Sequence, residues 1–171
     1  SWEPEQLSAE AATRGLTAIA ATDHNSTASV RALQAAGARH GLAVVSGVEL
    51  DSAFGGKLWH TLVYGADPEH PAMRALCAAV FERNAADAQR LRDELPARGF
   101  ALDGLDDLGR APNVAEVATA LARQNALPGR VAGEGDEEAG MRFLLTQLPG
   151  AYAPLGVDEI VAVAHELGAV A

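Results

Sequence analysis

The sequence predicts an α/β fold in which parallel strands form part of a barrel and a helical subdomain interrupts them. Three observations support this prediction. Helical patterns alternate with short apolar runs over residues 1–70, helical patterns alone fill residues 71–149, and residues 150–171 hold one helix and the start of a strand. Because such alternation is typical of parallel βα units, residues 1–70 and 150–171 are interpreted as barrel segments and residues 71–149 as the insertion.

The first barrel segment begins with a helix. Pro4 suits a first helical position and Gly15 a stop, so the chain between them is predicted to be helical. An apolar strand over residues 17–21 follows. Ser26 or Thr27 is then the expected N-cap of a second helix, and two further strands are expected, one at residues 43–45 and one around His60.

The inserted segment shows only helical patterns. Helices are predicted over residues 71–95, 114–122 and 136–148, with an acidic connector at residues 103–107. After Pro149 and Gly150, a helix is expected over residues 157–167, and residues 169–171 resemble the opening of another strand. These features suggest a barrel that is cut at both ends.

Composition limits the partners of the chain. The 171 residues are 49% hydrophobic, enough for one domain with an insertion, and the formal net charge is −10. Duplex nucleic acid is not an expected partner, because binding its backbone needs a basic face and the sequence has no cluster of lysines or arginines.

The expected compartment is the cytoplasm, without a membrane. The sequence contains no apolar stretch of about 18 residues that could span a bilayer, and residues 1–4 do not resemble a signal peptide. The single cysteine, Cys77, cannot form an internal disulfide and is expected to be a buried thiol rather than a nucleophile.

Three polar residues mark the candidate site. His24 follows the apolar run 18–21, Glu49 follows Gly47 and Val48, and His60 lies within the run 58–64. The carboxyl ends of parallel barrel strands meet on one face, so these side chains are expected to come together there. Two imidazoles and a carboxylate are suitable ligands for a first-row divalent metal.

Each of these residues also has a simpler interpretation. His24 could be a polar residue of a strand-to-helix turn, Glu49 a solvated strand end, and His60 a core histidine or one on an exposed face. The other histidines are not expected to bind metal, since His40 lies at a helix C-terminus, His70 in a loop and His165 within the last helix.

The three motifs GLTAIAATDHNS (residues 15–26), GVEL (47–50) and WHTLVYG (59–65) together resemble the polymerase and histidinol phosphatase (PHP) domain family. The resemblance is strong over residues 3–66 and weaker over residues 70–148, which are similar to the insertion of the small phosphoesterase branch. It implies a distorted (β/α)7 TIM-like barrel that holds two or three divalent metal ions, commonly manganese, zinc or iron, and hydrolyses phosphate esters.

Roles for individual residues follow from the resemblance. His24 and His60 would be metal ligands, Glu49 would bridge two metals, and Asp23 would lie behind a ligating imidazole and orient it. Phosphoesterases of this branch carry Arg-Pro-His-Ile-Ala in the insertion, with the Arg and His on substrate phosphate. The matching stretch here is Ala-Pro-Asn-Val-Ala at residues 111–115, so Arg110 and Asn113 are the candidate substrate-binding residues.

Other motifs of the family would lie outside the 171 residues. Its His-x-His motif would precede Ser1, and its His-Pro and Asp-x-His motifs would follow Ala171. Because ligands from one side cannot hold a two-metal cluster in rigid geometry, the isolated chain is expected to show no appreciable turnover.

Three functions therefore remain open at this stage. The first is a metal-dependent phosphoesterase that acts on a small phosphorylated metabolite or nucleotide through a metal-activated water. The second is a non-catalytic barrel fragment or interaction module that binds metal weakly. The third is a metal hydrolase that cleaves a C–N or C–O bond. The sequence does not define the ester, the metal, the number of metals or the oligomeric state.

Overall fold

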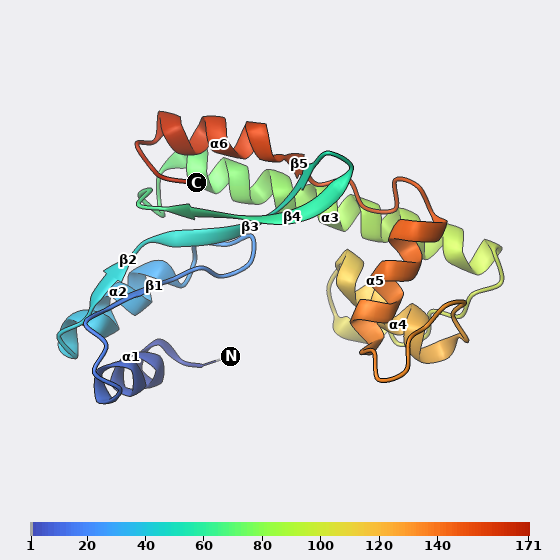
Figure 1. Cartoon of the computed structure of the whole chain (residues 1–171), viewed down its shortest axis with the longest axis horizontal. Helices are drawn as coiled ribbons and strands as arrows, with labels where there is room; N and C mark the ends of the chain where they lie inside the picture. Colours follow the sequence, from blue (N-terminus) through green and yellow to red (C-terminus); the bar gives the residue numbers. More distant parts are fainter. Residues whose placement is uncertain (1) are drawn as a thin grey trace. The chain divides into compact units, whose positions relative to one another are not determined.

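A computed structural model describes residues 2–171, and these divide into two compact units (Figure 1). Unit 1 contains the chain up to Val80 together with Pro154–Ala171, and unit 2 is Phe81–Ala153. The sequence analysis placed the boundaries near residues 70 and 150. In the structure, the first boundary lies ten residues later, inside the long helix α3 (Pro71–Ala97).

Unit 1 is a mixed α/β structure. Besides the first part of α3, it contains α1 (Pro4–Thr13), β1 (Ala18–Ala20), α2 (Val30–Arg39), β2 (Ala43–Val45), β3 (Gly47–Phe54), β4 (Lys57–Tyr64), β5 (Leu155–Gly156) and α6 (Val157–Glu166). The described strands form a parallel pair, β1–β2, and a three-stranded sheet in the order β4-β3-β5, rather than a closed barrel.

The prediction that the His60 strand belongs to a parallel βα unit was wrong. Strand β4 is antiparallel to β3 and follows it through a tight hairpin turn at Gly55 and Gly56. Both glycines have positive φ values, 58° and 75°, as two-residue hairpin turns require. Strands β1 and β2, and β3 and β5, do pair in parallel.

The N-terminus of α2 also differs from the prediction. Its N-cap is Ser29, not Ser26 or Thr27. The two earlier hydroxyls are used in the preceding turn, where Ser26 Oγ accepts from the Ala28 amide at 3.2 Å and Thr27 Oγ1 donates to the Pro68 carbonyl at 2.9 Å. Because these hydroxyls belong to the turn, the helix begins only at Val30.

The chain that follows β1 pairs first with β2 and then with β3. This pairing places the turn that carries His24 beside β3. The Ala21 amide donates to the Val45 carbonyl at 3.1 Å, and further along the Asn25 amide donates to the Glu49 carbonyl at 2.8 Å. Gly47 is required at this crossing, because a Cβ there would lie 2.7 Å from the Ala21 carbonyl oxygen.

One face of the β3–β4 hairpin forms the main core of unit 1. Val48, Leu50 and Val63 are almost fully buried, and they share a cluster with Met73 of α3 and Ile160 of α6. Alternate residues of β3 and β4 point to the opposite face. Glu49 and Asp51 of β3 and His60 of β4 are therefore displayed on the face that is not packed against α3 and α6.

Unit 2 is helical. It holds the rest of α3, the short 3₁₀ helix η1 (Asp106–Leu108), α4 (Val114–Gln124) and α5 (Asp136–Gln147). Val117 and Leu121 of α4, Leu144 of α5 and Leu91 of α3 are fully buried in its core. None of the described helices of either unit is both long enough and apolar enough to cross a membrane.

Candidate metal centre

Strand β3 positions two carboxylates of the site. Glu49 and Asp51 are two residues apart, so both side chains project from the same face of the strand. His60 of β4 lies directly opposite Asp51 in the antiparallel register and shares that face.

His24 reaches the same face from the turn after β1. It forms a parallel bridge with Glu49, and the Glu49 amide donates to the Asp23 carbonyl at 3.1 Å. These main-chain bonds fix His24 beside β3. Three separate segments of unit 1 thus deliver four side chains to one place.

Glu49 lies between the two imidazoles. Its Oε2 atom is 3.2 Å from His24 Nε2, and its Oε1 atom is 3.0 Å from His60 Nδ1. The two rings meet edge to face, with centroids 4.8 Å apart. Each carboxylate oxygen of Glu49 therefore faces a different imidazole.

Asp51 approaches the same two rings from the other side. Its Oδ1 atom is 3.7 Å from His24 Nδ1 and 3.6 Å from His60 Nε2. Sequence reasoning missed Asp51, although the Glu-x-Asp spacing on a strand already places it on the same face as Glu49. One donor atom from each of His24, Asp51 and His60 lies within 4.8 Å of the others.

The two carboxylates of the site are more buried than the two imidazoles. The exposed side-chain fractions are 13% for Asp51 and 26% for Glu49, against 56% for His24 and 54% for His60. Imidazole nitrogens and carboxylate oxygens are ligands that suit zinc, manganese and iron, and the two carboxylates offset the charge of a divalent cation. The residues present therefore fit a divalent metal.

Asp23, the residue before His24, contacts the start of α2. Its carboxylate accepts a hydrogen bond from the Ser29 hydroxyl at the start of α2. The structure shows no hydrogen bond or ion pair between this carboxylate and a described imidazole. The orienting role that was predicted for Asp23 stays a prediction.

Arg110 and Asn113 lie in unit 2, at the start of α4. The Arg110 guanidinium binds both carboxylate oxygens of Glu116, and this ion pair lowers the pKa of that carboxyl and raises the pKa of the arginine. Asn113 is the N-cap of α4 and forms a capping box with Glu116. These contacts stabilise the helix start, and the predicted contact with substrate stays a prediction.

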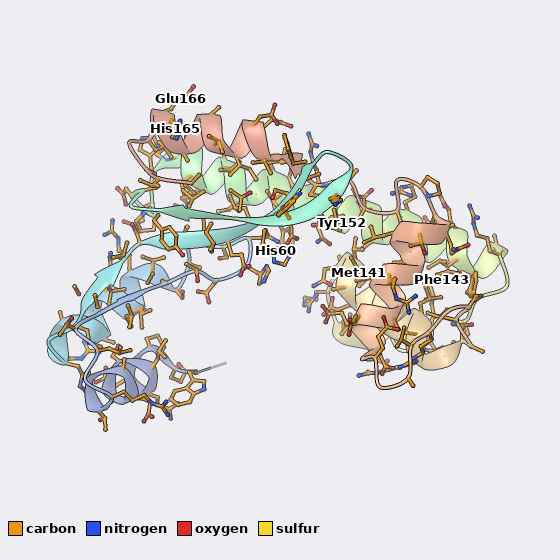
Figure 2. All side chains as sticks on the ribbon, viewed as in Figure 1. His60, Met141, Phe143, Tyr152, His165 and Glu166 are labelled. Atoms are coloured by element: carbon orange, nitrogen blue, oxygen red, sulfur yellow. The ribbon has the colours of Figure 1, made fainter. Side chains whose placement is uncertain are left out.

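The histidines that were not expected to bind metal, and Cys77, have other surroundings. Figure 2 shows His60 on the side of the hairpin opposite α6, whereas His165 lies on α6 itself. His40 Nε2 is 2.8 Å from a carboxylate oxygen of Glu5, and His70 Nδ1 accepts from the Ala72 amide at the start of α3. Cys77 is buried, and burial raises the pKa of its thiol, which disfavours the reactive thiolate.

The sequence is similar to two bacterial enzymes. Over 126 residues it is 33% identical to phosphoribosyl 1,2-cyclic phosphate 1,2-diphosphodiesterase of Eggerthella lenta, an alignment that covers 72% of this chain and 46% of that protein. Over 98 residues it is 32% identical to 3′,5′-nucleoside bisphosphate phosphatase of Chromobacterium violaceum, covering 57% of this chain and 34% of that protein. The chain thus spans less than half the length of either relative. No protein-family model matches the sequence.

Two solved structures share the fold. A protein classed as a metal-dependent phosphoesterase from Bifidobacterium adolescentis matches with a TM-score of 0.64 and 21% identity, over 99% of this chain and 60% of that one. An amidohydrolase from Chromobacterium violaceum, with bound sulfate and no metal, matches with a TM-score of 0.59 and 20% identity, over 98% of this chain and 59% of that one. At these identities the likeness shows the fold alone.

Proposed function

Because this chain belongs to a PHP-like phosphoesterase family, we propose that it supplies one side of the catalytic centre of a metal-dependent phosphoesterase. The observation that carries the proposal is the position of Glu49, whose two oxygens face two different imidazoles at 3.2 and 3.0 Å. A carboxylate in that position can bridge two cations, each of which also binds one histidine.

The cluster residues have distinct roles in this proposal. His24 and His60 hold the cations, and Glu49 joins the two halves of the centre. Bound divalent cations would supply a water of lowered pKa and would neutralise charge on a phosphate ester. The hairpin register fixes His60 against β3, and the backbone bonds of residues 23–25 fix His24, so the chain orients both imidazoles before any ligand binds.

The proposed scaffold of the complete protein is a distorted (β/α)7 barrel of the PHP type. Strands β1, β2 and β3 would belong to it, with residues 71–149 as its helical insertion. Both solved structures that share the fold are longer than this chain, which covers 60% and 59% of them. Further strands of the complete protein would bring the other ligands of the centre.

The proposed substrate is a small phosphorylated metabolite or nucleotide. The names of the two relatives, a cyclic phosphate diphosphodiesterase and a nucleoside bisphosphate phosphatase, support this class. The formal net charge of −10 supports a small substrate rather than duplex nucleic acid, because cations at one site can bind a single phosphate group but cannot create a basic face. Manganese, zinc or iron would serve as the cation, and the cytoplasm is the proposed compartment.

Phosphate release by the complete gene product that contains this chain tests the proposal. We expect hydrolysis of a nucleoside bisphosphate or a cyclic phosphate ester in the presence of manganese or zinc. Glu49→Gln should lower the rate at least about a hundredfold, because the bridge between the cations loses its charge. Glu166→Gln is the matched control, since Glu166 lies on α6, away from His60 (Figure 2), and it should leave the rate unchanged.

Two results would contradict the proposal. Absence of phosphate release from every such ester, with metal bound, would favour a non-catalytic module that only binds metal. An equal rate for Glu49→Gln and the unaltered protein would remove Glu49 from the centre.

A further inference from the structure

We propose that Asp51 is a further metal ligand of this chain and that Asn25 is the residue that positions it. This inference rests on the proposed function, because it adds to the same metal centre. Asp51 lies outside the quoted motifs, and the motif that contains Asn25 gives this residue no role.

The separation of the donor atoms is the first argument. Asp51 Oδ1 lies 3.7 Å from His24 Nδ1 and 3.6 Å from His60 Nε2, and both distances are too long for hydrogen bonds. Two ligand atoms that are each about 2.1 Å from one tetrahedral cation lie about 3.4 Å apart. The spacing around Asp51 therefore leaves room for a cation between this carboxylate and one ring nitrogen, in a tautomer in which the other nitrogen of that ring carries the proton.

The fixed orientation of Asp51 is the second argument. Asn25 holds this residue at two points, since its Nδ2 donates to Asp51 Oδ2 at 2.9 Å and its Oδ1 accepts from the Asp51 amide at 3.0 Å. With Oδ2 bound in this way, Oδ1 is the oxygen that faces the two imidazoles. A partner of this kind orients a ligand before the metal arrives.

The backbone at Asn25 is the third argument. Asn25 is the one non-glycine residue of the described chain with a positive φ, 54°. Left-handed backbone is costly for most residues, though less so for asparagine. Asn25 follows His24 directly in the sequence. The left-handed backbone at Asn25 therefore lets one short segment supply both an imidazole ligand and the two hydrogen bonds to Asp51.

Direct metal titration of the 171-residue chain tests the inference. Calorimetry with Zn²⁺ and Mn²⁺ should show binding by the unaltered chain and a loss of about ten- to a hundredfold in affinity for Asp51→Asn. Asp67→Asn is the matched control. It removes the same charge from an exposed residue of unit 1 that pairs with Arg31, and it should bind metal like the unaltered chain.

Asn25→Gly tests the positioning role. Glycine accepts the left-handed backbone, so the variant removes the amide without adding strain. We expect its affinity for metal to fall at least about fivefold, and thermal unfolding without metal measures the separate structural cost of the two lost hydrogen bonds. An affinity equal to that of the unaltered chain would remove Asn25 from the proposal.

The absorption spectrum of bound Co²⁺ separates ligation from a purely structural role. At saturation, loss of a ligand in Asp51→Asn should change the visible bands, whereas a residue that acts only through the imidazoles would leave them unchanged. Unchanged bands, or unchanged affinity, would overturn the assignment of Asp51. Absence of metal binding by the unaltered chain would overturn the assignment of Asp51, whereas the proposed function is tested separately by phosphate release from the complete gene product. Binding that is lost only in His24→Ala and His60→Ala would also overturn the assignment and would leave the proposed function standing.

Discussion

At the scale of single residues, the two-residue period of a β-strand determines which side chains face the site. Val48 and Leu50 of β3 are buried in the core, and Glu49 and Asp51 between and after them project from the other face. A shift of one residue in the β3–β4 register would place His60 in the core face and the cluster would be lost. The chemistry of the site therefore depends on that register.

Ser8 of α1 offers a test of residue-level energetics. Its side chain is fully buried, and among the described residues its hydroxyl has no hydrogen-bond partner. An unpaired buried polar group is destabilising, so Ser8→Ala should raise the free energy of unfolding by about 1 kcal/mol in urea titrations. Ser26→Ala, which removes an acceptor for the Ala28 amide, is the control and should lower it. Destabilisation by Ser8→Ala would mean that the hydroxyl has a partner.

Part of the cluster could be predicted from the sequence. The motifs single out His24, Glu49 and His60, because polar residues at the ends of apolar runs are conspicuous. Asp51 was missed because the strand was expected to end at Glu49, whereas β3 continues to Phe54 and its two-residue period places Asp51 on the same face. The contact of the Asp23 carboxylate with Ser29 at the start of the following helix was not predicted, because neighbours in three dimensions of this kind are not visible in a motif.

At the scale of elements, the contact between α4 and α5 depends on Gly140. A Cβ at this position would lie 1.9 Å from the Ala118 carbonyl oxygen, a backbone atom that cannot move aside easily. We predict that Gly140→Ala lowers the free energy of unfolding by about 3 kcal/mol, the upper part of the range for overpacked cores. Urea unfolding followed by circular dichroism measures this effect.

Gly135 is the matched control for that substitution. It is the N-cap of the same helix, has a φ of −63°, and has open space where a Cβ would be placed. Gly135→Ala should change the free energy of unfolding by less than about 1 kcal/mol. Equal effects of the two substitutions would show that α4 and α5 are not in the described contact.

The loop before α5 gives a prediction about pH. Arg142 and the Val131 amide hold the pKa of Glu134 at about 2, below its ordinary value of 4.5. Because the native state has the lower pKa, this carboxylate stabilises the fold above pH 4.5, and its contribution is lost as the pH falls toward 2. Glu134→Gln should therefore show a smaller loss of unfolding free energy between these pH values.

Glu137→Gln serves as the control for Glu134→Gln, because Glu137 is an exposed residue of the first turn of α5. Its unfolding free energy should depend on pH as that of the unaltered chain does. If Glu134→Gln keeps the full pH dependence, the ion pair with Arg142 does not contribute in solution.

The elements differ in how far the sequence defines them. Proline and glycine at the ends of helical patterns predicted the helices, including the long one that is observed over Pro71–Ala97. The antiparallel direction of β4 was not predicted, because apolar runs carry no information about strand direction. The glycine pair at residues 55 and 56 was the available signal for a hairpin.

At the scale of the whole molecule, the chain combines an α/β unit that carries the candidate metal centre with a helical unit, each with its own buried core. The described strands form two small sheets, and the relatives and solved structures that resemble the chain extend well beyond it. The sequence predicted the α/β class and the helical patterns that are observed in unit 2, whereas the described strands do not form the predicted barrel.

The central claim is that His24, Glu49 and His60 gather around shared cations. Metal analysis by plasma mass spectrometry of the purified chain tests it most directly, with Glu49→Ala and His60→Ala as variants and His165→Ala on α6 as the control. We predict bound manganese, zinc or iron in the unaltered chain and in His165→Ala, and its loss in both cluster variants. Equal metal content in all four proteins would contradict the account.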